Sequence, residues 1–297
     1  MNGKATNSTS NPPDPASQLT FQDHNRDVMG LTHVYPVVSR RAGGVSVGIN
    51  LNTNNACNWA CVYCQVPQLK RGNAPDIRME VLKDELSLML NALLQGDFLQ
   101  KHVPEPLRTF QDIAFSGNGE PTSSPQFEEA VRAVIEALKI HHLTGKIKLV
   151  LITNGSHALE PTVQRAMTLM SGANGEVWFK LDRGREEDVW HINRIHLNPA
   201  MILRRLSAAA AHCPTWVQTC MTSWDGKPPS DPEVQAYLDL MAAALEQGTP
   251  LRGVLLYSLA RPSLQPDAHR IGSLPLEWLE ALGKRIVQMG LPVRITP

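Results

Sequence analysis

Short apolar runs alternate with longer amphipathic stretches along most of the chain. The apolar runs predict strands over Val45–Leu51, Asp112–Ser116, Ile147–Thr153, Glu176–Asp182, Thr215–Met221 and Gly253–Tyr257, with a last short strand over Val293–Thr296. Apolar residues spaced by three or four positions predict helices over Arg78–Leu94, Gln126–Ile140, Thr162–Met170, Pro199–Ala211, Pro232–Gln247 and Leu276–Met289. Such alternation indicates an α/β fold with a parallel sheet and outer helices, either an incomplete barrel or an open sheet.

The first part of the chain has a different composition. Residues 1–27 are polar and rich in Asn, Ser and Pro, which predicts a disordered tail before one domain over 28–297. This start does not resemble a basic and apolar leader, and no apolar run approaches the roughly 20 residues that span a bilayer. We therefore expect a cytoplasmic protein that does not enter a membrane.

Charge and cysteine usage narrow the chemistry. The 28 Lys and Arg residues balance 28 Asp and Glu residues, so no overall positive field attracts nucleic acid. The pairs Arg40-Arg41, Lys70-Arg71 and Arg204-Arg205 are either local basic patches or solvated surface charge. The chain has five cysteines, three of them within eight residues, a crowding that disfavours a disulfide framework. Reduced thiols that bind a metal or a metal cluster are the better interpretation.

The three crowded cysteines, Cys57, Cys61 and Cys64, follow the first predicted strand with Cys-x3-Cys-x2-Cys spacing. A cubane iron–sulfur cluster has four irons, and cysteine thiolates normally bind all of them. Three local thiolates leave one iron open, as a catalytic metal keeps a position for its substrate. The open iron would chelate a small molecule that carries an amine and a carboxylate.

A structural zinc site is the main alternative for the same cysteines. Zinc usually takes paired ligands from two loops, and the sequence has no second Cys-x2-Cys. His191 and His196 have a spacing that zinc could use, and Cys213 could supply a lone fourth ligand. Cys213 and Cys220 are otherwise interpreted as buried thiols in and beside a core strand. These residues keep a non-catalytic zinc-binding module open as an alternative.

The cysteine spacing, with the aromatic Tyr63 before the last cysteine, resembles the signature of the radical S-adenosylmethionine superfamily. The resemblance implies a partial (β/α)6 TIM-like barrel, with Cys57, Cys61 and Cys64 holding a [4Fe–4S] cluster. It also implies that the cluster reductively cleaves S-adenosylmethionine to a 5′-deoxyadenosyl radical, which takes a hydrogen atom from a substrate. An oxidoreductase of this kind needs a reducing partner such as flavodoxin or ferredoxin.

Further polar residues follow the second predicted strand. Gly117 and Gly119 permit close backbone approach, and Glu120 offers an acceptor for a ligand ammonium. The segment resembles the Gly-Gly-Glu element by which the superfamily contacts the amino group of S-adenosylmethionine. Asn118 separates the two glycines here, although Gly-Asn-Gly-Glu-Pro-Thr is found in one branch. By itself such a segment is more often an ordinary turn.

The third and fourth predicted strands also end in polar residues, which a parallel barrel displays at its mouth. Asn154 is a candidate for ribose or the methionine carboxylate, and Asp182 for ribose hydroxyls; a turn and a helix cap are their structural alternatives. Lys180 lies two residues before Asp182, so strand alternation turns both to one side. We expect Lys180 to anchor a substrate charge rather than to act as a nucleophile or Schiff base.

A more specific resemblance runs from Tyr35 to about Ser258. The chain resembles the short radical S-adenosylmethionine proteins that are related to 4-demethylwyosine synthase, a tRNA enzyme of the wybutosine pathway. The resemblance rests on these segments: Tyr35–Arg41, Val45–Leu51, the cysteine loop, Ser116–Thr122, Leu151–Gly155, Lys180–Asp182 and Val217–Thr219. That enzyme binds a second cluster through cysteines that precede the first, whereas no cysteine precedes Cys57 here, and its RNA-binding surface is basic.

These departures favour a small-molecule substrate over tRNA. A wyosine-type tRNA enzyme and a non-catalytic iron–sulfur regulator stay open as alternatives. Arg40 and Arg41 are expected to pair with acidic residues or to contact the substrate.

Overall fold

The computed structural model describes residues 19–20, 28–39 and 42–296. Its main sheet has eight strands in the order β1-β2-β5-β6-β7-β8-β10-β12. Their bounds are Val34–Ser39, Gly44–Ile49, Phe110–Phe115, Lys148–Thr153, Gly175–Lys180, Thr215–Cys220, Leu251–Tyr257 and Val293–Thr296. β1 runs antiparallel to β2, and every other neighbouring pair in this sheet is parallel. The sheet curls into a half-barrel, which confirms the predicted partial barrel.

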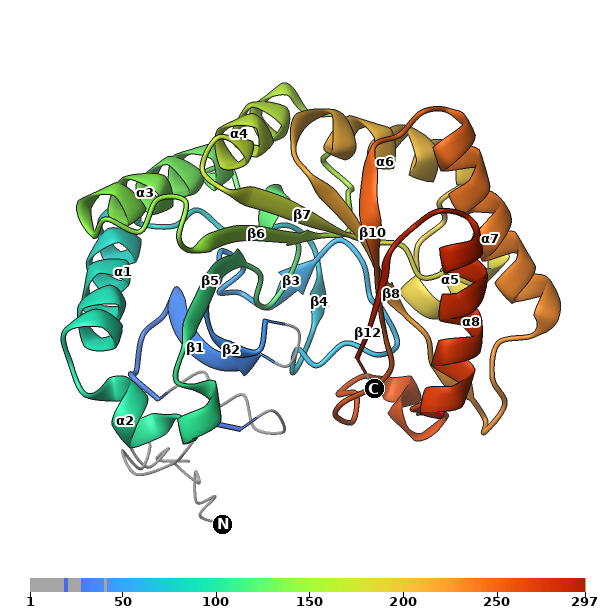
Figure 1. The fold of residues 1–297 in the computed structure, drawn as a ribbon, viewed down its shortest axis with the longest axis horizontal. Helices are drawn as coiled ribbons and strands as arrows, with labels where there is room; N and C mark the ends of the chain where they lie inside the picture. The colour runs from blue at the N-terminus through green and yellow to red at the C-terminus, as the bar shows by residue number, and fades with distance from the viewer. Residues whose placement is uncertain (1–18, 21–27, 40–41, 297) are drawn as a thin grey trace, which may run out of the picture.

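The longer helices cover the outer side of this sheet and form an arc around it (Figure 1). The helices are α1 Met79–Leu94, α2 Phe98–His102, α3 Phe127–Ile140, α4 Pro161–Ser171, α5 Glu186–Asn193, α6 Pro199–His212, α7 Asp231–Glu246 and α8 Leu276–Gln288. Two small sheets pair β3 Ala56–Cys57 with β4 Lys70–Arg71, and β9 Ser223–Trp224 with β11 Ile271–Gly272. Short 3₁₀ turns span Glu105–Leu107, Pro121–Ser123 and Pro266–His269.

Two hydrophobic layers lie on the two faces of the curled sheet. The outer layer, between strands and helices, is the main core. The apolar residues that α1 buries in it recur at three- and four-residue intervals, as the predicted helix requires: Leu82, Leu86, Met89, Leu90 and Leu93. The inner layer is small and consists of Ala114, Val150, Trp178, Trp216 and Leu255. Trp178 and Trp216 are paired in register on β7 and β8, and the Arg294 guanidinium lies 4.4 Å from the Trp216 ring. These large rings fill part of the barrel interior.

β1 has no counterpart among the strands predicted from sequence. Pro36 lies at its centre, opposite Val47 of β2, and proline is tolerated only in an edge strand because it has no N–H to donate. An antiparallel edge position meets this requirement. β1 also brings Tyr35 over Gly48, where an added Cβ atom would lie 2.1 Å from the tyrosine ring. The strand therefore supplies one wall to the barrel interior.

Most of the predicted N-terminal tail, residues 1–18 and 21–27, lies outside the described residues, as do Arg40 and Arg41. Within the tail, Leu19 is buried and its amide donates a hydrogen bond of 2.8 Å to the carbonyl of His102. In the part of the chain that the structure describes, no helix combines the length and apolar character required to traverse a bilayer.

Candidate active site

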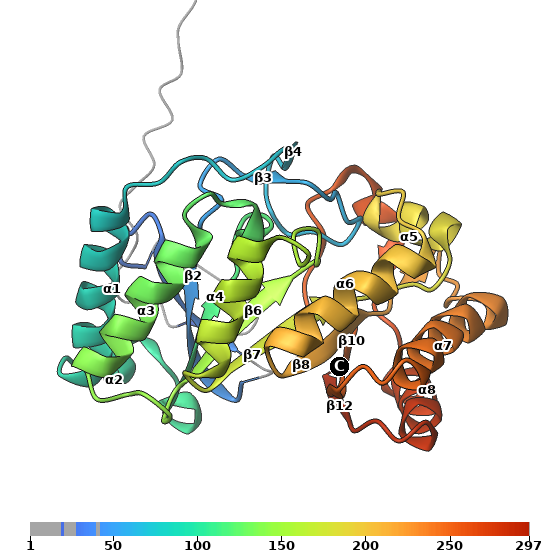
Figure 2. The same ribbon diagram turned by 90° about the horizontal axis from the view of Figure 1, so that it is seen from above.

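The cysteine loop lies between β2 and α1, above the carboxyl ends of the strands. Cys57 belongs to β3, which pairs with β4 so that Cys57 stands opposite Arg71. In Figure 2, β3 and β4 lie on the same side of the sheet as α5. This is the barrel mouth, where the sequence predicted the reactive residues to gather.

All three thiols line one cavity of about 320 Å³ at this mouth. Burial raises the pKa of Cys57 to about 12 and that of Cys61 to about 11. The amide of Trp59 lies 3.5 Å from Cys57 Sγ, and the side-chain amide of Asn193 lies 3.3 Å from Cys61 Sγ. Both thiols are therefore neutral, and a metal that bound them would have to displace their protons.

Two distant segments hold the cysteine loop in place. The end of α5 accepts two of its backbone hydrogen bonds, from Ala60 to Asn193 at 3.2 Å and from Val62 to Ile192 at 2.8 Å. On the other side, the hydroxyl of Ser263 donates to the carbonyl of Val62 at 2.6 Å. Gln265 adds hydrogen bonds to the carbonyls of Cys64 and Val66 at 3.1 Å and 2.9 Å. The loop conformation thus depends on both α5 and the segment after β10.

Asn193 is a site residue that sequence reasoning missed. It is buried, ends α5, and its side-chain amide contacts both Cys61 Sγ and the Asp182 carboxylate, the latter at 2.8 Å. α5 has eight residues, three of which are the acids of its first turn, so it lacks the long apolar periodicity that marks a helix in sequence. Its one signal was a polar residue at the end of a short Val-Trp-His-Ile segment.

Glu120 lies on the cavity wall after β5 and is almost fully buried. Its Oε1 accepts hydrogen bonds from the Thr122 amide at 3.2 Å, the Thr122 hydroxyl at 2.6 Å and the Thr153 hydroxyl at 2.7 Å. Its Oε2 accepts one recorded bond, from the amide of Asn154 at 2.6 Å. Because Oε2 accepts fewer bonds than Oε1, it retains capacity for a ligand ammonium.

The loop that carries Gly117 and Gly119 packs closely against the cysteine loop and the end of β2. Asn50 Oδ1 accepts the amide of Asn118 at 3.1 Å, and a Cβ atom on Gly117 would lie 2.5 Å from that same oxygen. A Cβ atom on Gly119 would lie 2.0 Å from the carbonyl oxygen of Ala56, the residue before Cys57. Gly119 therefore lets two backbones approach beside the thiols, and Gly117 leaves room for the Asn50 side chain.

We expect Gly119→Ala to destabilise the protein by about 2 kcal/mol and to reduce the iron bound after anaerobic reconstitution. The added methyl group must push Ala56, and with it Cys57, away from β5. Urea unfolding and iron content per chain are the measurements. Gly172→Ala is the matched control, because its Cβ atom would meet its nearest neighbour at an ordinary 3.6 Å. Wild-type stability and iron content in Gly119→Ala would contradict this packing.

Asn154 connects the third predicted strand to the cysteine loop. Its side-chain amide donates to Asn58 Oδ1 at 2.8 Å, and its own Oδ1 accepts the amide of Ser156 at 2.9 Å. It also lines the cavity, close to Glu120 through the bond to that carboxylate. The structure thus brings Asn154 into the predicted site, where part of its hydrogen-bonding capacity serves the loops around it.

Asp182 and Tyr63 form a buried pair under the cysteine loop. The Tyr63 hydroxyl donates to Asp182 Oδ2 at 2.5 Å, and the amide of Cys220 donates to Asp182 Oδ1 at 2.8 Å. Burial, followed by the negative charge of Asp182, raises the pKa of Tyr63, so the hydroxyl stays protonated. Tyr63 lines the main cavity, whereas Asp182 lines a small adjoining one. Both Asp182 oxygens are thus used inside the protein, and its predicted contact with ribose stays a prediction.

Lys180 lines the main cavity at the end of β7. Its ammonium nitrogen lies 5.1 Å from the centroid of the Tyr63 ring, a favourable cation–π arrangement. Burial lowers its pKa, but the acidic groups of Tyr257, Cys61 and Asp182 outweigh burial and raise the pKa above its usual value. Lys180 therefore remains protonated, as a charge-binding role requires and a nucleophilic role does not.

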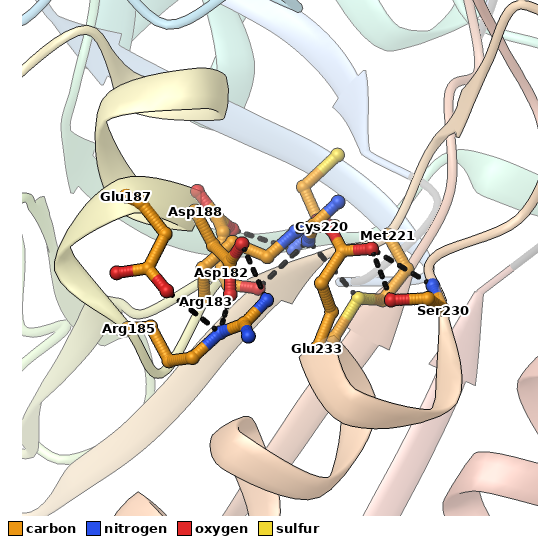
Figure 3. Close-up of polar contacts among 9 residues, drawn as sticks. All are labelled: Asp182, Arg183, Arg185, Glu187, Asp188, Cys220, Met221, Ser230 and Glu233. Atoms are coloured by element: carbon orange, nitrogen blue, oxygen red, sulfur yellow. Dashed lines mark hydrogen bonds and ion pairs between the residues drawn. The ribbon is translucent and has the colours of Figure 1, made fainter.

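A buried arginine ties the ends of β7 and β8 to α7 (Figure 3). Arg183 donates to the carbonyl of Asp182 at 2.7 Å and to that of Cys220 at 3.5 Å, and its Nε lies 3.9 Å from the Glu233 carboxylate. Glu233 in turn accepts from Ser230 in a capping box that starts α7. These contacts fix the strand ends that carry Asp182 and Cys220.

The donor set of the cysteine loop fits a cluster with three protein ligands. Each thiolate of a cubane binds a different iron, so the sulfurs need not converge on one point as they do around zinc. Among the described residues, no three His, Cys, Asp or Glu side chains are grouped as ligands of a single metal ion. The histidines of the zinc alternative do not line the cavity with the thiols: His191 packs on the Trp224 ring and His196 stacks on Trp190.

Comparisons with known proteins give partial matches in sequence and broader matches in structure. No protein-family profile matches the chain. A UPF0026 protein of Helicobacter pylori strain J99 is 33% identical over 136 residues, which are 44% of this chain and 37% of that protein. The corresponding protein of strain 26695 is 32% identical over 134 residues, again 44% and 37%. The chain thus matches less than two fifths of the length of these curated relatives.

Two solved structures share the fold at low sequence identity. A radical S-adenosylmethionine methyltransferase from Sphaerobacter thermophilus superposes with a TM-score of 0.54 and 14% identity, over 89% of this chain and 68% of that one. A mutant of spore photoproduct lyase superposes with a TM-score of 0.50 and 14% identity, over 81% and 74%. The partial barrel of this chain is therefore a fold on which radical S-adenosylmethionine enzymes are built.

Proposed function

We propose that the protein is a radical S-adenosylmethionine enzyme that acts on a small-molecule substrate. One observation supports this proposal above the others. Three thiols line one cavity at the barrel mouth, and Glu120 and Asn154 line the same cavity. Cys57, Cys61 and Cys64 would hold the [4Fe–4S] cluster, leaving one iron for the cofactor. Held there, such a cluster would supply the electron for cleavage of S-adenosylmethionine into methionine and a 5′-deoxyadenosyl radical, and the radical would take a hydrogen atom from the substrate.

The residues around the thiols have separate tasks in this proposal. Glu120 Oε2 would accept the ammonium of the methionine moiety, because that oxygen has one recorded donor among the described residues. Gly117 and Gly119 let the backbone come close to that moiety, and Asn154 would bind the ribose or the methionine carboxylate. The lining aromatic and apolar groups, among them Tyr63 and Ile152, exclude water from a reactive intermediate.

The cavity also bears on the substrate class and branch. The cavity has a volume of about 320 Å³, and the balance of 28 basic and 28 acidic residues favours a small molecule over anionic RNA as the substrate. We also propose that the chain belongs to the branch related to 4-demethylwyosine synthase, on the resembling segments from Tyr35 to about Ser258, without that enzyme's tRNA substrate. A cytoplasmic location and reduction by a flavodoxin or ferredoxin are parts of the same proposal.

The direct test is anaerobic purification and reconstitution, followed by iron, sulfide and zinc analysis and by dithionite reduction with S-adenosylmethionine. We expect about four irons and four sulfides per chain and the release of 5′-deoxyadenosine. Zinc without iron or sulfide would instead support a zinc-binding module, and a cluster without cofactor cleavage would support an iron–sulfur regulator. Retention of tRNA in a gel at moderate salt would contradict the small-molecule assignment.

A further inference from the structure

The wall of the main cavity contains a cation for which the protein provides no counter-ion in contact. Among the residues that the structure describes, the Lys180 ammonium has no recorded hydrogen bond or ion pair, only its cation–π contact with Tyr63. The nearby Asp182 carboxylate is already bound by Tyr63, Cys220 and Asn193. Three ammonium N–H donors are thus available to a molecule in the cavity.

Lys180 lies on a different part of the cavity wall from the residues assigned to the cofactor. Gly119, Glu120 and Asn154 follow β5 and β6, whereas Lys180 ends β7, next to β8 and β10 in the sheet. Cys220 and Tyr257, which are paired in register on β8 and β10, line the cavity on that side. The cavity therefore has two polar sides, one on β5 and β6 and one on β7, β8 and β10.

An unsatisfied acceptor lies beside Lys180 in the sheet, on a residue that does not itself line the cavity. Gln218 is paired in register with Lys180, it is 1% exposed, and its Oε1 has no hydrogen-bond partner among the described residues. A buried polar atom without a partner costs free energy, and such atoms in native structures mark bound water or ligand groups. Lys180 is therefore the charged donor on this side of the cavity, and the unsatisfied Gln218 acceptor lies next to it on the adjacent strand.

Lys180 is half-buried in the cavity wall, and an ammonium with reduced access to water is stabilised most by an anionic oxygen group. One ammonium balances one negative charge, which matches a carboxylate. We propose that Lys180 binds a carboxylate of the substrate, so that the enzyme acts on a small organic acid. That the bound acid is the substrate rests on the proposed function. The carboxylate-binding site itself does not depend on the cluster.

The test measures binding of propionate and of its uncharged isostere propionamide to the reconstituted protein by equilibrium dialysis. We expect the wild type to bind propionate at least tenfold more tightly than propionamide. Lys180→Met should remove this preference, and Lys180→Arg should retain most of it. Lys139→Met is the matched control, because Lys139 is exposed on α3 and should leave the preference unchanged.

A parallel measurement of S-adenosylmethionine binding separates the outcomes. Less than a twofold change in cofactor affinity in Lys180→Met, with propionate binding lost, supports a substrate subsite. Equal loss of both would mean that Lys180 holds the methionine carboxylate and would overturn the inference, as would equal binding of propionate and propionamide by the wild type. Charge-selective binding without any cofactor cleavage would preserve the site and refute the proposed function. Circular dichroism of each variant checks that it is folded.

Discussion

Cys61→Ala is expected to prevent assembly of the cluster and to lower 5′-deoxyadenosine formation more than 100-fold. Cys61 is the middle cysteine of the loop, is 9% exposed, and lies between Asn193 and the cavity. Its loss would leave two thiolates for a cluster that needs three protein ligands here. The measurements are iron and sulfide per chain, the electron paramagnetic resonance signal after dithionite reduction, and 5′-deoxyadenosine by chromatography.

Cys213→Ala is the matched control for this prediction. Cys213 is also a buried thiol, but it ends α6 and does not line either described cavity. Its replacement should cost about 1 kcal/mol of stability and leave cluster content and cofactor cleavage intact. If Cys61→Ala retained a full cluster, or if both variants lost it equally, the assignment of the cysteine loop as the cluster site would be wrong.

Glu120→Gln is expected to weaken binding of S-adenosylmethionine by about 10- to 100-fold while iron content stays at the wild-type level. A hydrogen bond from an ammonium to a carboxylate contributes about 1.5–3 kcal/mol, and every 1.4 kcal/mol is a tenfold change in affinity. The variant also places an amide N–H₂ among donors from Thr122, Thr153 and Asn154. We therefore expect an additional loss of about 1–3 kcal/mol in unfolding free energy.

Equilibrium dialysis of the cofactor against the reconstituted protein measures the first effect, and urea unfolding measures the second. Glu136→Gln is a suitable control, because the Glu136 side chain is 63% exposed on α3. Loss of iron in Glu120→Gln, with cofactor affinity unchanged in the protein that still carries a cluster, would show that Glu120 supports the cysteine loop instead.

The parallel strands could be predicted because they are continuous apolar runs. Helices cover their outer faces, and part of their inner faces is buried in the barrel interior. β1 was missed because Pro36 argues against a strand unless its edge position is known. α5 was missed because it is short and polar. In both cases the secondary structure depends on which segments pack beside it in the fold, and the local sequence does not give those neighbours.

The same limit applies to the site. Spacing along the chain was sufficient to single out Cys57, Cys61 and Cys64, and all three line one cavity. Asn193 could not be found in this way, since it contacts Cys61 across 132 residues of sequence. Nor could the sequence reveal that both oxygens of Asp182 are used by Tyr63 and by the strand after it.

The long-range hydrogen bonds that hold the cysteine loop have a consequence for when a metal cluster could be inserted. The loop is held by Asn193, 132 residues away, and by Ser263, 201 residues from its partner Val62. Contacts of such long range form late in folding, because the entropy of closing a long chain segment must be overcome first. In zinc fingers the metal drives the chain to fold, whereas here the barrel has to close before the thiols are presented together. Iron would then be loaded into a folded precursor rather than onto a nascent chain.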